Sequence, residues 1–318
     1  MKRALSVLLI AAMILTIGVY AAAESAEPRQ ESDDSTVRPQ KNPVYELYSA
    51  DGVYTDSIGN EETYSFHVPQ IFADSAAADE INAEIAENFG ERVETQFHNM
   101  EGGHSLWSWR TEWHAYWNGS QMFLLIKSDV SGDCDEYGAY GYDFETDSRV
   151  TNEMILEQRG ISKEVYLENL KEAVRSKYEM AHSGIPADLL ETSDYAELLE
   201  KTMEWQTLEE PVFIDQFGEI ETIALIGAMA GAGQYYHLVT PFVHHISIVG
   251  DSGLVESCPE TAHAGETVTV SLYDATDGDL EISAEGVDGT RVGWLEYQFV
   301  MPAHDVDVKV EFIGNGLA

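Results

Sequence analysis

The stretch Leu106–Val130, LWSWRTEWHAYWNGSQMFLLIKSDV, carries the strongest pattern in the chain. Successive side chains of a β-strand point to opposite faces, so residues at every second position share a face. On that spacing, one face of the first half carries Trp107, Trp109, Thr111, Trp113, Ala115 and Trp117. Asn118-Gly119 then supplies two residues that accept positive φ in a tight turn. The stretch therefore predicts a β-hairpin with an aromatic face, which the rest of its domain must cover.

The segment just before this hairpin predicts an amphipathic helix. Five large apolar residues recur there at four-residue intervals: Ile81, Ile85, Phe89, Val93 and Phe97. That spacing places them on one stripe of a helix, with glutamates on the other side. We expect the stripe to pack on the tryptophan face of the hairpin. The opposite face then becomes the candidate binding surface, with Arg110, Glu112, His114 and Tyr116.

Two domains are predicted after residue 43. Residues 44–243 mix strand patterns with helix patterns, such as the apolar spacing across Lys163–Ala181. We expect an α+β fold there, with helices packed on an antiparallel sheet. Residues 244–318 change to short alternating strands separated by turn dipeptides, as in Val306, Val308 and Val310. That alternation predicts a small C-terminal all-β domain.

The N-terminal residues predict secretion. Two basic residues precede an apolar run, Ala4–Val19, and a small-residue cleavage site follows at Ala21–Ala23. This order is typical of a signal peptide covering residues 1–23, and the alternative is that the run is retained as a membrane anchor. Residues 24–43 are rich in Glu, Ser, Asp and Pro, which predicts a disordered linker. We therefore expect a secreted protein, outside the cell or at its surface, that is free of the membrane once the signal is cleaved.

The chain is strongly acidic, with 57 Asp and Glu against 17 Lys and Arg and a net charge of −40. Such a surface repels nucleic acid and anionic lipid, so neither is expected as a partner. It attracts cationic proteins and divalent cations. The alternative is that the charge serves solubility alone.

An acidic segment after the hairpin gives the one candidate cofactor, calcium. Its oxygen-bearing side chains have the alternating spacing of a calcium loop: Asp129, Ser131, Asp133 and Asp135. An EF-hand loop also requires Gly at its sixth position and Glu at its twelfth. Cys134 and Tyr140 stand at those positions. A solvated loop is therefore the alternative to a calcium site.

The chain has two cysteines, Cys134 and Cys258. In an oxidising compartment they would pair across the two domains, and a loop of that length would stabilise the fold by about 4–5 kcal/mol. Two free thiols are the equal alternative, because many secreted bacterial proteins avoid disulfides. Neither cysteine has a neighbour in a CxxC pattern, which argues against a zinc site.

Three segments of the first domain resemble one bacterial family. They are Tyr142–Asp147, Pro211–Gly218 and Ala230–His237. They look like the fD-x-x-T-G turn and the closing f-x-D-x-x-G and AG-x-x-x-YY segments of an extracytoplasmic domain. That domain occurs in anti-sigma-V factors, which bind lysozyme, and ahead of the catalytic domain in a peptidoglycan deacetylase. The likeness covers about residues 44–242, and it departs from the family at Asp147-Ser148, where the turn usually has glycine. It implies a sensor-like α+β domain.

A second resemblance covers the C-terminal domain. Ala264–Val270 and Tyr297–Val308 are similar to the AGETVTV and YTFTMPA-x-DVTV segments of divergent internalin-B-type repeats, which belong to secreted bacterial surface proteins. This likeness extends over about residues 246–314. It implies a spacer or adhesive module without catalytic residues.

No pattern in the sequence assigns a catalytic residue, so location, charge and resemblance carry the functional prediction. The leading hypothesis is a secreted, non-catalytic cell-envelope protein that binds a cationic, lysozyme-like protein or a cell-wall glycan. One alternative is a cell-wall-active hydrolase, whose two carboxylates the sequence cannot single out among so many acids. The other is a structural spacer or adhesion module without a specific ligand.

Overall fold

The computed structural model describes residues 43–130, 134–186, 190, 192–229, 233–274 and 278–314. The predicted signal peptide, the linker up to residue 42, Ser131 and Asp133 lie outside this part of the chain. Within the described ranges, no helix is long and apolar enough to cross a membrane.

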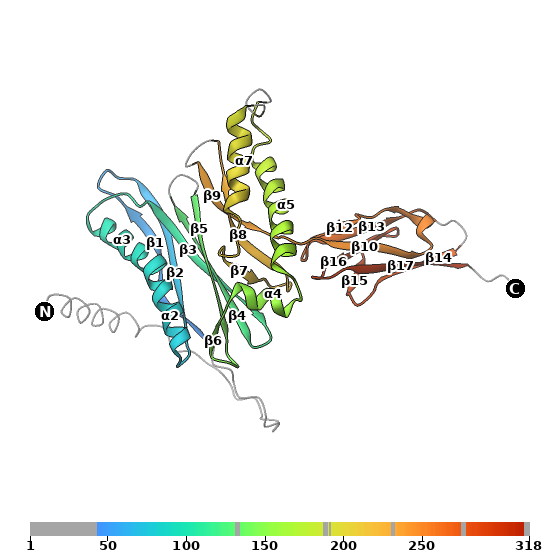
Figure 1. The fold of residues 1–318 in the computed structure, drawn as a ribbon, viewed down its shortest axis with the longest axis horizontal. Helices are drawn as coiled ribbons and strands as arrows, with labels where there is room; N and C mark the ends of the chain where they lie inside the picture. Colours follow the sequence, from blue (N-terminus) through green and yellow to red (C-terminus); the bar gives the residue numbers. More distant parts are fainter. Residues whose placement is uncertain are drawn as a thin grey trace, which may run out of the picture. The chain divides into compact units, whose positions relative to one another are not determined.

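A six-stranded sheet forms the centre of the first domain, in the order β1-β2-β3-β4-β5-β6 (Figure 1). Its strands are β1 (Val44–Thr55), β2 (Glu61–Ile71), β3 (Ser108–Asn118), β4 (Gln121–Val130), β5 (Cys134–Asp143) and β6 (Ser148–Val150). All neighbours are antiparallel except β2 and β3, which run parallel. Together with the helices described below, this sheet confirms the predicted α+β class.

The predicted hairpin is present as β3 and β4. Its turn lies one residue later than expected, since Asn118 pairs with Gln121 and Gly119-Ser120 forms the loop. Gly119 has a φ of 65°, a conformation that glycine adopts without steric cost. Glycine at the first central position is typical of a type II′ hairpin turn, whose twist matches that of the two strands.

The tryptophans of the hairpin do not share one covered face, contrary to the prediction. A β-bulge at Trp109 inserts one extra residue into β3, so the alternation restarts there. Ser108 and Thr111, three positions apart, are consequently both fully buried. The two ends of the row remain in solvent, where Trp107 is 37% and Trp117 44% exposed. Side-chain spacing alone does not reveal a bulge, which is why the sequence suggested a continuous row.

The core of the large sheet lies on β4 instead. Every residue from Gln121 to Ile126 is buried, and successive side chains enter opposite faces of the sheet. One core contains Met122, Leu124 and Ile126, and the other contains Phe123 and Leu125. A strand that is buried on both faces accounts for the continuous apolar run in the second half of the hairpin.

One face of the sheet is covered by a helical segment made of α2 (Ala76–Ile85), a π-helical turn η1 (Ala86–Gly90) and α3 (Glu91–Glu101). The Ser75 hydroxyl caps its start by accepting a hydrogen bond from the Ala78 amide at 3.2 Å. Four of the five predicted stripe residues are buried against the sheet, and Phe97 is partly buried. The predicted helix is confirmed, and it packs on the sheet that contains the hairpin, but not on a continuous row of tryptophans: Trp113 contacts the core that it covers, whereas Trp107 and Trp117 are exposed.

A three-stranded sheet lies against the other face, with β7 (Val212–Ile214), β8 (Ile220–Gly227) and β9 (Gln234–Val239). The helices α4 (Asn152–Gln158), α5 (Lys163–Ala181) and α7 (Ser193–Trp205) complete this layer (Figure 1). The ring of Tyr116 on β3 stacks on Phe213 of β7, with 5.9 Å between ring centres. The part of the large sheet from β3 to β6 is thus covered on both faces, whereas the sequence indicated a partner for only one.

The C-terminal domain contains two four-stranded sheets, which confirms its predicted all-β architecture. Its strands are β10 (His244–Gly250), β11 (Val255–Ser257), β12 (Thr261–Ala262), β13 (Thr267–Leu272), β14 (Gly278–Ala284), β15 (Gly289–Arg291), β16 (Glu296–Val300) and β17 (Val306–Gly314). A short 3-10 turn, η2 (Ser252–Leu254), precedes β11. The apolar alternation on β13 and β17 fills the core with Val268, Val270, Val308 and Val310.

Candidate functional site

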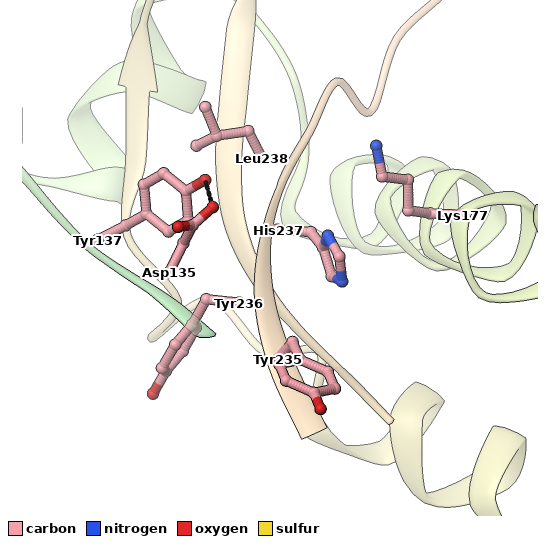
Figure 2. A pocket seen from close by; sticks show the side chains of 7 residues that line it. All are labelled: Asp135, Tyr137, Lys177, Tyr235, Tyr236, His237 and Leu238. Atoms are coloured by element: carbon pink, nitrogen blue, oxygen red, sulfur yellow. Dashed lines mark hydrogen bonds between the residues drawn. The ribbon is translucent and has the colours of Figure 1, made fainter. Parts of the chain in front are cut away.

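A cavity between β5 and β9 is the candidate site (Figure 2). It has a volume of about 430 Å³ and is lined by Asp135, Tyr137, Lys177, Tyr235, Tyr236, His237 and Leu238. β5 supplies the first two residues, α5 the lysine and β9 the other four. Segments far apart in the sequence therefore meet at this site.

Strand alternation decides where the side chains of β9 point. Tyr236 points to the side on which Tyr137 lies, whereas Tyr235 and His237 point to the side of Lys177 on α5 (Figure 2). β9 is an edge strand of the three-stranded sheet. Side chains from both of its faces therefore reach the same cavity around the open edge.

A second cavity of about 270 Å³ lies next to the first and shares two of its lining residues. Tyr137 and Tyr236 line both cavities and stand where the two meet. The other residues that line the second cavity are Asn88, Phe89, Arg92, Glu136, Tyr140, Glu210, Pro211 and Ile223. We call the combined space the β5–β9 cleft.

Several polar groups of the β5–β9 cleft already have partners. Lys127 Nζ lies 3.1 Å from Asp135 Oδ2, and the Tyr137 hydroxyl donates to the same oxygen at 3.2 Å. Burial raises the pKa of Tyr137 to about 12, and the charge of Asp135 adds to the rise. Burial also lowers the pKa of His237. This imidazole is therefore neutral at pH 7 and acts as a polar aromatic group.

Two groups at the other end of the cleft, Arg92 and Glu210, are not fully paired. Arg92 forms an ion pair with Glu136 through Nη2, and its guanidinium carbon lies 5.5 Å from the centre of the Trp107 ring. Its Nε and Nη1 atoms are buried without a hydrogen-bond partner in the described part of the chain. Burial, helped by the charge of Glu209, raises the pKa of Glu210. Because unpaired buried polar groups are costly, this end of the cleft suits a ligand with polar groups of its own.

Two of the four predicted calcium ligands pair with a lysine. Asp129 and Asp135 lie directly opposite each other on β4 and β5. Lys127 Nζ is 3.3 Å from Asp129 Oδ1 and 3.1 Å from Asp135 Oδ2, so its ammonium group takes the place between the carboxylates that a metal ion would need. The described residues contain no group of three or more side chains suited to hold a metal. Ser131 and Asp133 lie outside those residues, and calcium binding stays a prediction.

Part of the predicted binding surface on β3 packs against another strand of the protein. Arg110 and His114 are exposed, and Glu112 is half-buried. The ring of Tyr116 stacks on the rings of His114 and Phe213. The distances between ring centres are 6.2 Å and 5.9 Å. Tyr116 therefore belongs to the contact between β3 and β7. Of the predicted binding surface, Arg110, Glu112 and His114 are left for a ligand.

Cys258 carries a free, half-buried thiol. Burial raises its pKa, which keeps the thiol protonated and less reactive at neutral pH. The side chain of Cys134 lies outside the described part of the chain, so its state stays open.

Glu221 on β8 has a strongly raised pKa. Burial raises it to about 7, and the charges of Asp215 and Glu219 add to the rise. The Thr240 hydroxyl donates a hydrogen bond to its Oε1 at 2.6 Å, which acts in the opposite direction. A carboxyl group with a pKa near 7 has one property of the general acid of a glycosidase.

The sequence patterns did not single out Tyr137, Tyr236 or Arg92 as site residues. The one available signal was the Tyr235-Tyr236 pair, which belongs to a segment that carries the first family resemblance. Arg92 gave no signal, since a single arginine on an amphipathic helix looks like a solvated residue.

The sequence matches no protein-family model and no curated protein. The two family resemblances drawn from its segments therefore stay predictions, and the function must be argued from the cleft and the charge of the chain.

Proposed function

We propose that the protein is a secreted, non-catalytic protein of a bacterial cell envelope that binds a cationic protein, with lysozyme as the test ligand. The observation that carries this proposal is the tyrosine-lined β5–β9 cleft, in which Tyr236 remains 41% exposed. The C-terminal all-β domain serves as a spacer or adhesive module.

Tyrosines suit a binding role for physical reasons. The ring offers apolar area, the hydroxyl offers a hydrogen bond, and few rotatable bonds must be ordered on binding. Tyr137 and Tyr236 line both cavities, so a ligand that fills the cleft contacts them. Residues of this type at the centre of an interface often carry most of the binding energy.

The charge of the chain favours a cationic partner. A net charge of −40 accelerates encounters with positively charged proteins and discourages anionic ones. This attraction is long-ranged at low salt and is screened beyond about 8 Å at physiological ionic strength. Charge therefore contributes to the rate of association, while contacts in the cleft determine the lifetime of the complex.

Replacing Tyr236 with alanine should weaken lysozyme binding by about 30-fold, because truncating a central interface tyrosine costs about 2 kcal/mol. Isothermal titration calorimetry at low and high salt measures the effect. For the wild-type protein, the dissociation constant should rise by about tenfold as salt screens the attraction.

Tyr273→Ala is the matched control, because Tyr273 is a similarly exposed tyrosine, 51% in solvent, in the C-terminal domain. It should leave lysozyme binding unchanged. Equal affinities for the two tyrosine variants would remove the cleft from the proposal. An affinity that is the same at low and high salt would remove its electrostatic part.

Glu221 favours a second candidate function, hydrolysis of the cell wall. Burial raises its pKa to about 7 and the charge of Asp215 adds to the rise, and a carboxyl group with such a pKa can serve as a general acid. Incubation of the protein with peptidoglycan tests this candidate. Reducing ends released by the wild type and lost in Glu221→Gln would replace the binding proposal, whereas binding of peptidoglycan fragments without turnover would change the ligand from a cationic protein to a glycan.

A further inference from the structure

β5 has a free edge along most of its length. On one side it pairs with β4 from Cys134 to Asp143, whereas on the other side β6 pairs only with Gly141–Asp143. No strand among the described residues pairs with Asp135–Tyr140 on that second side. Backbone groups on such an edge are available to another chain.

The register of the β4–β5 ladder shows which backbone groups face the free edge. The Phe144 amide donates to the Ser120 carbonyl at 3.0 Å, in the register of that ladder. Hydrogen-bonded pairs alternate with non-bonded pairs in antiparallel strands, so the even-numbered residues of β5 bond to β4. The N–H and C=O groups of Asp135, Tyr137 and Ala139 therefore point to the free edge.

The β5–β9 cleft reaches both faces of this edge. Tyr140 packs with the helical layer, and Tyr137 packs with the layer of the three-stranded sheet. Both residues nevertheless line the same 270 Å³ cavity. A cavity that touches both faces of an edge strand passes across its free edge, so space is present where the unpaired backbone groups point.

We propose that an extended segment of the protein partner adds to the free edge of β5 as a further strand and places a basic side chain beside Glu210. This inference rests on the proposed function and specifies how the partner is held. Main-chain hydrogen bonds to Asp135, Tyr137 and Ala139 supply affinity, and alternate side chains of the added segment enter the two sides of the cleft.

On the side of the three-stranded sheet, the negative charge of Glu210 favours a basic side chain from the added segment. Glu210 lines the cleft on that side, and its carboxylate has no ion-pair partner in the described part of the chain. The apolar stem of a lysine or arginine would lie along Tyr137 and Tyr236 and bring its charge to Glu210. On the helical side, a side chain with an oxygen acceptor would meet the unpaired nitrogens of Arg92.

A capped peptide of alternating threonine and lysine is the probe, because threonine favours strands and lysine supplies the charge. Its binding should slow amide hydrogen exchange at Tyr137 and Ala139, measured by NMR. Exchange at the amides of Tyr140 and Tyr142 should change little, because even-numbered residues of β5 already donate their N–H groups to β4. A peptide methylated at every backbone nitrogen keeps its charge but loses its N–H donors. Its affinity should be at least about tenfold lower. Unchanged exchange at Tyr137 and Ala139 with saturating peptide would overturn the proposal.

Ala139→Pro tests the edge directly, because proline removes an N–H that faces outward and is tolerated on an edge strand. The peptide should bind this variant about tenfold more weakly, while Ala139→Ser keeps the N–H and should bind normally. Equal affinities for the two variants would contradict the edge contact. If Ala139→Pro fails to fold, the exchange measurement on the wild type still decides.

Glu210→Gln tests the basic side chain, with Glu209→Gln as the matched control. Glu209 is the exposed neighbour, whereas Glu210 lines the cleft. The first variant should weaken peptide binding by about fivefold and the second should leave it unchanged, since an ion pair in a half-buried site contributes about 1 kcal/mol. Equal affinities for the two variants would show that the basic side chain lies elsewhere.

Lysozyme separates failure of this inference from failure of the proposed function. If lysozyme binds Ala139→Pro, Glu210→Gln and the wild type equally well and leaves the exchange of β5 unchanged, strand addition is wrong while the binding function stands. If neither lysozyme nor the peptide binds the wild type, the proposed function fails and strand addition fails with it.

Discussion

Leu124→Ala should lower the free energy of unfolding by about 2–5 kcal/mol, the range for truncating a buried leucine in a close-packed core. Leu124 is fully buried on β4, between the large sheet and the helical layer. Trp117→Ala should cost less than about half of that, although it removes more atoms, because 44% of Trp117 already lies in solvent. The difference follows from the position of the core on β4 and not along the tryptophan row.

Urea unfolding followed by tryptophan fluorescence measures both variants. Five of the six tryptophans lie in the first domain, so the signal reports mainly on the domain that contains Leu124. Far-ultraviolet circular dichroism of each variant before unfolding is the control for an intact fold. A cost for Trp117→Ala that equals or exceeds the cost for Leu124→Ala would mean that the tryptophan row is the core after all.

Glu221→Gln should stabilise the protein at pH 8 by up to about 3 kcal/mol, because a rise in pKa from 4.5 to about 7 disfavours the ionised form in the fold by that order. The unfolded chain loses this proton near pH 4.5, whereas the folded chain keeps it until about pH 7. Native stability therefore falls as the pH rises through this window and stays lower above it. Glutamine cannot ionise, and its side-chain oxygen can still accept the hydrogen bond from Thr240.

The free energies of unfolding of Glu221→Gln and the wild type should be compared at pH 4, 6 and 8 by urea unfolding. The two proteins should be nearly equal at pH 4 and diverge as the pH rises. Glu256→Gln, at an exposed position, is the control and should show no such divergence. A constant difference at all three pH values would show that folding does not raise the pKa of Glu221.

Local periodicity sufficed for the elements that depend on local sequence. The four-residue spacing from Ile81 to Phe97 gave the helix, and the apolar spacing across Lys163–Ala181 gave α5 with its observed bounds. The two-residue alternation around Val306 gave β17. In each case one face of the element is buried, so the burial pattern is written directly into the sequence.

Features that depend on distant segments could not be predicted in this way. The bulge at Trp109 changes which side chains face inward, and no residue type in β3 requires it. The three-stranded sheet covers Tyr116 with Phe213, a residue far along the chain. The β5–β9 cleft likewise arises only when Tyr137 and Tyr236 meet, and neither strand carries a motif that specifies the other.

Chemical-shift mapping of the isotope-labelled protein with unlabelled lysozyme tests the cleft as the binding site most directly. The largest changes should fall on Tyr137, Tyr236 and His237, which line the cleft. Changes confined to Arg110 and His114 on β3, or to the C-terminal domain, would contradict the assignment of the partner to the cleft between β5 and β9.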